Sequence, residues 1–108
     1  MRQEHNKLVR DNIPEIIERE EKKYKCKILS QSEFIAALKS KIIEEAQEIA
    51  ASSDREELIQ EVADLYEAVD TLLSAKQIER EKIIKAKQEK QKAKGGFQKR
   101  IKLIWTEE

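Results

Sequence analysis

The sequence predicts an all-α protein, and three observations support this fold class. Charged residues make up 41% of the 108 residues and apolar residues 39%, with only two glycines and one proline to interrupt helices. The apolar residues recur at helical spacing rather than alternating as they do in strands. Two such stripes follow one another in the middle of the chain. We therefore expect a bundle of about four helices in a single domain over residues 1–108, completed by oligomerisation, with a short extended C-terminal segment.

The N-terminal region predicts one short helix followed by a connector. Asn12 has the chemistry of an N-cap and Pro14 suits a first helical turn, so we predict a helix from about Pro14 to Lys23. This helix would bury three side chains, those of Ile13, Ile16 and Ile17. Residues 24–29 alternate in character and are β-prone, which indicates an extended connector in which Cys26 would be small and buried.

The second helix begins at Ser30 or Ser32, with Glu33 supporting its first turn, and is predicted to continue to about Ala51. At about 100° per residue, its apolar residues fall on one face. They are Phe34, Ile35, Leu38, Ile42 and Ile49.

Residues 52–54 break this helix, and Asp54 with Glu57 indicates a capping box for a third helix that ends near Ser74. Its apolar stripe consists of Leu58, Val62, Leu65, Val69 and Leu72. The two long helices should form an αα-hairpin. Ile43 and Ile59 fall off the main stripes, which indicates a second packing face, and we expect a homodimer or homotetramer.

A fourth helix is predicted over residues 77–94, which are mostly Lys, Glu, Gln and Ala. Gly95-Gly96 should end it, and residues 97–105 follow as the extended segment. Residues 76–102 hold eleven bases and three acids, whereas residues 33–70 hold eleven acids and three bases. An acidic region followed by a basic one suits a metal-bridged polyphosphate site, although two complementary faces that pack on each other would give the same pattern.

Four carboxylates form two helical pairs on the central helices, each spaced i, i+3: Glu45 with Glu48, and Glu61 with Asp64. Glu45 falls near the middle of the second helix's apolar stripe, and a carboxylate there is costly unless it is paired or binds a cation. Solvated surface charge is the common explanation for such pairs. Their occurrence on consecutive helices favours an oxygen-only metal site instead, suited to Mg²⁺ with Mn²⁺ as a second option.

Basic residues near the two ends of the chain could hold phosphate groups. Lys7 and Arg10 lie in the N-terminal segment, and Lys92, Lys94, Lys99 and Arg100 surround the Gly-Gly turn. For Lys99 and Arg100, a solvated basic surface is an equally good explanation. A nucleic-acid-binding helix has some support from charge, but no aromatic residues are interleaved with the lysines, so we do not expect a nucleic-acid partner.

The acidic residues and both ends of the chain resemble a known family. EEAQE at residues 44–48, then twelve residues, then EVAD at residues 61–64 is similar to the EExxE…ExxD signature of the MazG-like superfamily of all-α nucleoside triphosphate pyrophosphohydrolases. NKLVRDNIP at residues 6–14 resembles the NKLVRDKIP start of a phosphoribosyl-ATP pyrophosphohydrolase-like branch, with Asn12 where Lys is usual. GGFQKRI at residues 95–101 is similar to that branch's GGF-KRI ending.

This resemblance implies an Mg²⁺-dependent hydrolase that cleaves a nucleoside triphosphate, or phosphoribosyl-ATP, between the α- and β-phosphates to give the monophosphate and pyrophosphate. It places the metal ligands at Glu45, Glu48, Glu61 and Asp64. Glu45 or Glu48 would be the general base, and the residues do not separate base from ligand. Damaged or noncanonical nucleotides are equally compatible substrates. A non-catalytic helical module that binds a nucleotide or a protein is the alternative from a different class.

The expected location is the cytoplasm. A single cysteine cannot form an internal disulfide, which suits a reducing compartment. The N-terminus has no apolar region typical of a signal peptide, and no apolar run is long enough to span a membrane.

Overall fold

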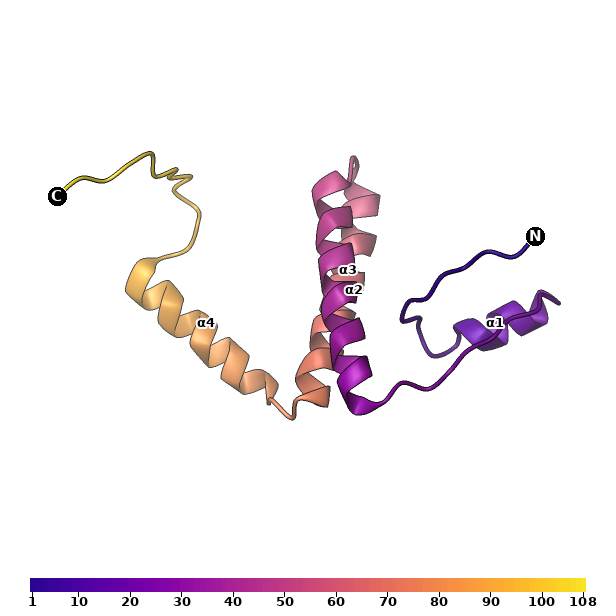
Figure 1. Cartoon of the computed structure of the whole chain (residues 1–108). Coiled ribbons are helices and arrows are strands. Elements are labelled where there is room, and N and C mark those ends of the chain that lie inside the picture. Colours follow the sequence, from indigo (N-terminus) through magenta and orange to yellow (C-terminus); the bar gives the residue numbers. More distant parts are fainter. The chain divides into compact units, whose positions relative to one another are not determined.

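The computed structural model describes all 108 residues, which form four α-helices and no β-strand. The helices are α1 (Ile13–Arg19), α2 (Gln31–Ala51), α3 (Arg55–Ala75) and α4 (Arg80–Lys94) (Figure 1). The all-α prediction and the expected number of helices are confirmed. The chain divides into two compact units: Met1–Gln77 contains α1, α2 and α3, and Ile78–Glu108 contains α4. No helix combines the length and the apolar character needed to cross a membrane.

The centre of the first unit is the hairpin of α2 and α3, which run side by side in opposite directions (Figure 1). Leu38 and Ala68 are its buried apolar residues, with 2% and 6% of their surface exposed. Most other stripe residues are half-buried between the two helices. Leu58 was predicted to lie on the packed face and is 42% exposed, because it stands in the first turn of α3, where the stripe begins.

Side-chain caps explain where the two long helices begin. The Ser30 hydroxyl accepts a hydrogen bond from the N–H of Glu33, whose carboxylate accepts one from the N–H of Ser30, so Ser30 is the N-cap of α2. Asp54 caps α3 by accepting from the N–H of Glu57 at 2.8 Å. The second hydrogen bond of the predicted capping box, from the N–H of Asp54 to the Glu57 carboxylate, is not formed. The Glu57 carboxylate instead accepts a hydrogen bond from the Ser53 hydroxyl.

The N-terminal part of this unit departs from the prediction in three respects. Asn12 occupies the N-cap position of α1 but makes no side-chain cap hydrogen bond. The helix ends at Arg19, earlier than predicted, since Glu21 adopts a positive φ of 58° that an α-helix cannot continue. Ile16 and Cys26 are exposed and Ile13 and Ile17 are only half-buried, rather than buried as predicted, because α2 and α3 pack on each other and no helix packs closely on α1.

The second unit consists of α4 and a C-terminal segment without helix or strand. Its helix begins at Arg80 rather than at Gln77, because Gln77 has a positive φ of 57°. Gly95 ends the helix as predicted, with a φ of 83° that glycine adopts without steric cost. No residue of α4 is buried.

Candidate metal centre

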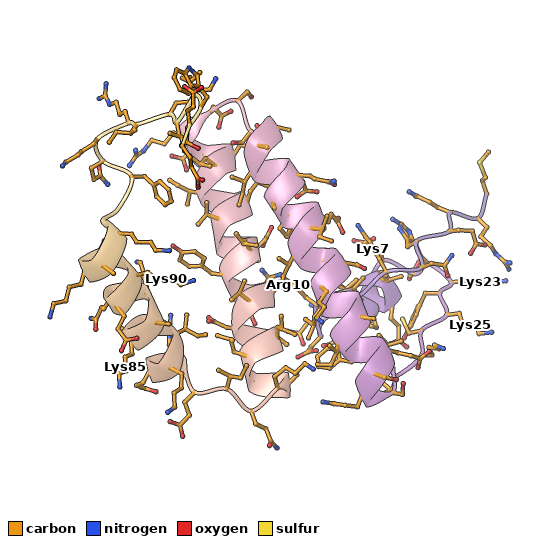
Figure 2. The ribbon with its side chains drawn as sticks, turned by 60° about the vertical axis from the view of Figure 1, so that its left-hand side comes forward. Lys7, Arg10, Lys23, Lys25, Lys85 and Lys90 are labelled. Atoms are coloured by element: carbon orange, nitrogen blue, oxygen red, sulfur yellow. The ribbon has the colours of Figure 1, made fainter.

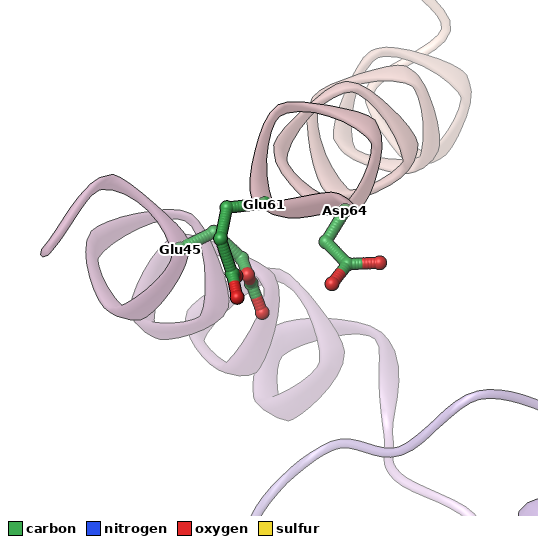
Figure 3. Close-up of side chains that lie close together, drawn as sticks. All are labelled: Glu45, Glu61 and Asp64. Carbon is green, nitrogen blue, oxygen red and sulfur yellow. The ribbon is translucent and has the colours of Figure 1, made fainter. Parts of the chain in front are cut away.

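Three carboxylates from the two hairpin helices meet at one place. Glu45 comes from α2, while Glu61 and Asp64 come from α3, and one oxygen of each lies within 4.8 Å of the others (Figure 3). The antiparallel arrangement of α2 and α3 brings these residues together although Glu45 and Glu61 are 16 positions apart in the sequence. Carboxylate oxygens converging from two helices form a ligand set for a hard divalent cation.

Burial distinguishes this cluster from ordinary surface acids. Glu45 has only 3% of its surface exposed, and it is the one buried charged residue of the chain. The Oε2 atoms of Glu45 and Glu61 are both buried and have no hydrogen-bond partner. An unpartnered carboxylate oxygen in such a place is costly unless a cation or a proton compensates it. The two oxygens therefore fit a bound metal ion.

The pKa values of these acids are raised, in agreement with their crowding. A hydrogen bond shared with the Glu48 carboxyl, followed by burial and a hydrogen bond with Glu45, raises the pKa of Glu61 to about 7. Burial, followed by the charge of Glu48, raises the pKa of Glu45. Carboxyl groups this close cannot all ionise without a countercharge. The raised pKa values of Glu45 and Glu61 show that the charged forms of these two carboxyls are disfavoured without a cation.

Glu48 adjoins the cluster without belonging to its tightest part. Glu48 is exposed, and it is the group that contributes most to the raised pKa of Glu61. The structure thus brings three of the four predicted ligands together and places the fourth beside them. The difference in burial follows the sequence pattern, in which Glu45 is inside the apolar stripe and Glu48 is at its edge.

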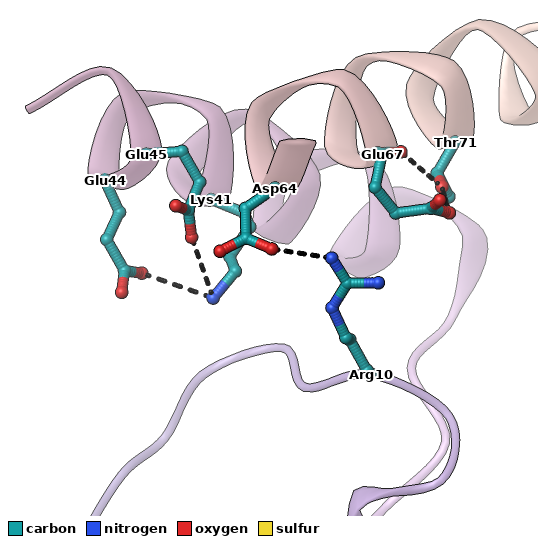
Figure 4. Close-up of polar contacts among 7 residues, drawn as sticks. All are labelled: Arg10, Lys41, Glu44, Glu45, Asp64, Glu67 and Thr71. Carbon is teal, nitrogen blue, oxygen red and sulfur yellow. Dashed lines mark hydrogen bonds and ion pairs between the residues drawn. The ribbon is translucent and has the colours of Figure 1, made fainter. Parts of the chain in front are cut away.

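Two basic residues of the N-terminal segment contact acids of the hairpin at or next to the cluster. The Arg10 guanidinium donates a hydrogen bond from Nη2 to Asp64 Oδ1 at 2.7 Å (Figure 4). The Lys7 ammonium lies 3.4 Å from Glu44 Oε1. Both side chains remain about half exposed, and both are labelled in Figure 2. The predicted pair of N-terminal bases is therefore held beside the acidic cluster.

Lys41 is a member of this group of charges that the sequence reading did not single out. Its Nζ lies 3.4 Å from Glu45 Oε1 and 3.9 Å from Glu44 Oε2 (Figure 4). The signal was present in the sequence, since Lys41 and Glu45 are spaced i, i+4 on one helix. Glu44 accordingly pairs with two lysines and is not part of the three-carboxylate cluster.

The predicted C-terminal bases all belong to the other compact unit. Lys92 lies in the last turn of α4, and Lys99 and Arg100 follow the glycine pair. All three are exposed, as are Lys85 and Lys90, which are labelled along α4 in Figure 2. Their role in binding a phosphate stays a prediction.

In a comparison with models of protein families, residues 6–91 match the phosphoribosyl-ATP pyrophosphohydrolase family. The matched range contains Lys7, Arg10 and all four predicted acids, and it ends before Lys99 and Arg100. Neither the curated proteins nor the solved structures contain a match to this chain. Since the family match covers most of the sequence, the chain belongs to the phosphoribosyl-ATP pyrophosphohydrolase family, the members of which are hydrolases of nucleotide phosphoanhydride bonds.

Proposed function

We propose that this chain hydrolyses phosphoribosyl-ATP or a nucleoside triphosphate between the α- and β-phosphates, releasing pyrophosphate in an Mg²⁺-dependent reaction. The observation that supports this proposal most strongly is the pair of buried, unpartnered carboxylate oxygens of Glu45 and Glu61 beside Asp64. The family supplies the reaction class, and the donor set supplies the preference for a hard cation.

Glu45, Glu61 and Asp64 would hold the ion, with Glu48 beside them as a further ligand or as the base. Mg²⁺ suits all-oxygen ligands, and Mn²⁺ would be accepted by the same set. When bound, such an ion neutralises charge on the leaving pyrophosphate and makes a water molecule a better nucleophile. The exposure of Glu48 favours it over the buried Glu45 as the general base that accepts the proton from water.

Lys7 and Arg10 would bind the phosphate groups of the substrate. Arg10 pairs with Asp64 of the acidic cluster, and Lys7 pairs with Glu44, the sequence neighbour of Glu45. Each base could exchange its carboxylate partner for a phosphate oxygen of the substrate. Arginine can contact a phosphate through two parallel N–H groups, whereas lysine supplies a point charge. Lys92, Lys99 and Arg100 are proposed as additional phosphate ligands on the basis of sequence alone.

We also propose a domain organisation, an assembly and a location for this chain. We treat residues 1–108 as one domain, since the family match runs across both compact units. Ile43 and Ile59 are 59% and 46% exposed on α2 and α3, and a second copy of the chain would cover them in a homodimer or homotetramer. The exposed, unpaired Cys26 suits the reducing cytoplasm.

The test is to measure pyrophosphate release from phosphoribosyl-ATP and from a panel of canonical, deaminated and oxidised nucleoside triphosphates. Each substrate is assayed with Mg²⁺, with Mn²⁺ and with a chelator. We expect metal-dependent release from one preferred substrate, with the monophosphate as the second product. If folded protein released no pyrophosphate from any of them, a non-catalytic nucleotide-binding module would replace the enzyme.

A further inference from the structure

Lys41 occupies an unusual position for a lysine on the surface of a helix. Its ammonium stands between two carboxylates of the next turn, Glu44 and Glu45, and its side chain is only 26% exposed. The other lysine of α2, Lys39, is exposed and makes no ion pair. The position of Lys41 therefore calls for an explanation beyond surface charge.

The i, i+4 spacing of Lys41 and Glu45 does not by itself explain why they form an ion pair. In isolated helices an i, i+4 ion pair is better with the acid N-terminal to the base, and here the lysine comes first. What distinguishes this pair is that its carboxylate is buried, with 4% of the Glu45 side chain exposed. A buried carboxylate needs a countercharge, and the Lys41 ammonium is the only cation within 4 Å of Glu45.

The two oxygens of Glu45 have different surroundings. Oε1 faces Lys41 at 3.4 Å, whereas Oε2 is buried and has no partner. The carboxylate is thus only partly compensated in the metal-free chain. Oε1 is held by a cation of the protein itself, and one oxygen of Glu45 lies within 4.8 Å of oxygens of Glu61 and Asp64, where a second cation would fit.

We propose that Lys41 is a built-in counter-cation of the metal site, which competes with a divalent ion for the charge of Glu45 and thereby sets the affinity for the metal. This inference rests on the proposed function, since it requires that the acidic cluster binds a metal. Lys41 acts through Glu45 and is a positioning residue, not a ligand. It stays anchored one turn from Glu45, and with a divalent ion at the cluster its ammonium is free to face a phosphate.

Lys7 and Arg10 are weaker candidates for this role. They lie in a segment without regular structure, pair with Glu44 and Asp64 rather than with Glu45, and are more exposed than Lys41. Lys41 is attached one turn from the buried carboxylate on the same helix, so its ammonium is always within reach of Glu45. This fixed attachment makes Lys41 the better candidate for a competitor of the metal.

The full chain is first freed of metal with a chelator, which is then removed. Mg²⁺ is added in a titration at fixed ionic strength, and binding is measured by calorimetry and by the shift of the unfolding temperature. Lys41→Met removes the charge and keeps much of the length, and Lys41→Gln is a second neutral variant. Lys41→Arg keeps the charge. Lys39→Met is the matched control on the same helix.

We expect both neutral variants to unfold at a lower temperature without metal and to bind Mg²⁺ about threefold to tenfold more tightly than the unmodified chain. Lys41→Arg and Lys39→Met should stay within about twofold of it. In a Glu45→Gln background, Lys41→Met should no longer lower the metal-free unfolding temperature, because the charge that it opposes is gone.

The outcomes separate the two proposals. If the unmodified chain binds Mg²⁺ and the neutral variants bind it equally or more weakly, Lys41 does not compete with the metal and only this inference fails. If the unmodified chain binds no Mg²⁺, the metal site itself is wrong, and the inference falls with it.

Discussion

The α2–α3 hairpin and the C-terminal unit are both rich in charge, yet they place it differently. Residues 33–70 carry eleven acids and three bases, and residues 76–102 carry eleven bases and three acids. In the hairpin, one of the acids is buried and two carboxylate oxygens lack a partner. In α4 every residue is exposed. The density of charge is thus a poor guide to a site, and the position of a charge relative to an apolar stripe is a better one.

The strongest test of this contrast exchanges a carboxylate for an amide in each region. Glu45→Gln and Glu61→Gln should each lower kcat/KM for pyrophosphate release by about a hundredfold or more, because a ligand of the metal is lost. Both should also reduce the thermal stabilisation by Mg²⁺. Glu89→Gln on α4 is the matched control, since Glu89 is exposed, and it should keep full activity.

The metal-free stability of these variants gives a second measurement. Removal of one charge from a crowded cluster relieves repulsion, so the unfolding temperature without metal should rise in Glu45→Gln and Glu61→Gln. Should both variants gain stability and still bind Mg²⁺ as the unmodified chain does, the acids would be a source of repulsion only, and the metal site would have to be abandoned.

The contribution of apolar side chains to stability should also differ between the α2–α3 hairpin and α4. Leu38→Ala removes a side chain that is 2% exposed in the hairpin and should lower the free energy of unfolding by about 2–4 kcal/mol. Ile83→Ala removes one that is 44% exposed on α4, and its effect should be within about 0.5 kcal/mol. Urea unfolding followed by circular dichroism measures both. Equal effects would mean that Ile83 is covered in the assembled protein.

Substitution of Arg10 should have an effect of intermediate size on activity. Arg10→Ala removes the guanidinium that contacts Asp64 and should lower kcat/KM about tenfold, mainly through KM, if Arg10 binds substrate phosphate. Arg10→Lys should recover part of this loss, because the charge returns without the second N–H group. Lys85→Ala on the exposed surface of α4 is the control. Equal activity of the Arg10→Ala and Lys85→Ala variants would contradict phosphate binding by Arg10.

The smallest expected effect concerns pH. Glu61 titrates near 7 in the folded metal-free chain, above its ordinary value of 4.5, so the folded state retains a proton that the unfolded state loses between these values. Stability without metal should therefore fall as pH rises from about 5 to about 7 and then level off. Thermal unfolding at a series of pH values measures this, and Glu61→Gln should flatten the curve. A curve of the same slope in that variant would show that another group is responsible.

Much of the fold was predictable because it depends on local interactions. The capping residues Ser30 and Asp54 and the glycine at position 95 fixed three helix ends as expected. The errors occurred at Glu21 and Gln77, where a non-glycine residue takes a positive φ. No sequence pattern indicates those two conformations, so α1 ended early and α4 began late.

The candidate site was predictable to the extent that it follows the apolar stripe. Glu45 interrupts that stripe and is buried, while Glu48 stands at its edge and is exposed. The sequence predicted that Lys7 and Arg10 bind phosphate. It did not predict that Arg10 contacts Asp64 or that Lys7 contacts Glu44. The exposure of Ile16 and Cys26 was missed, because an apolar side chain in a short segment is buried only if another element covers it.

The sequence by itself determined the number of helices, the caps at Ser30 and Asp54, the four acids and the family to which the chain belongs, because each of these depends on residue type and spacing. Only the tertiary structure decided which charges meet. The antiparallel register of α2 and α3 sets Glu45 against Glu61 and Asp64, buries one carboxylate beside Lys41 and leaves two oxygens without a partner. Burial and distance between helices govern the strength of those interactions, and neither is a property of a single segment.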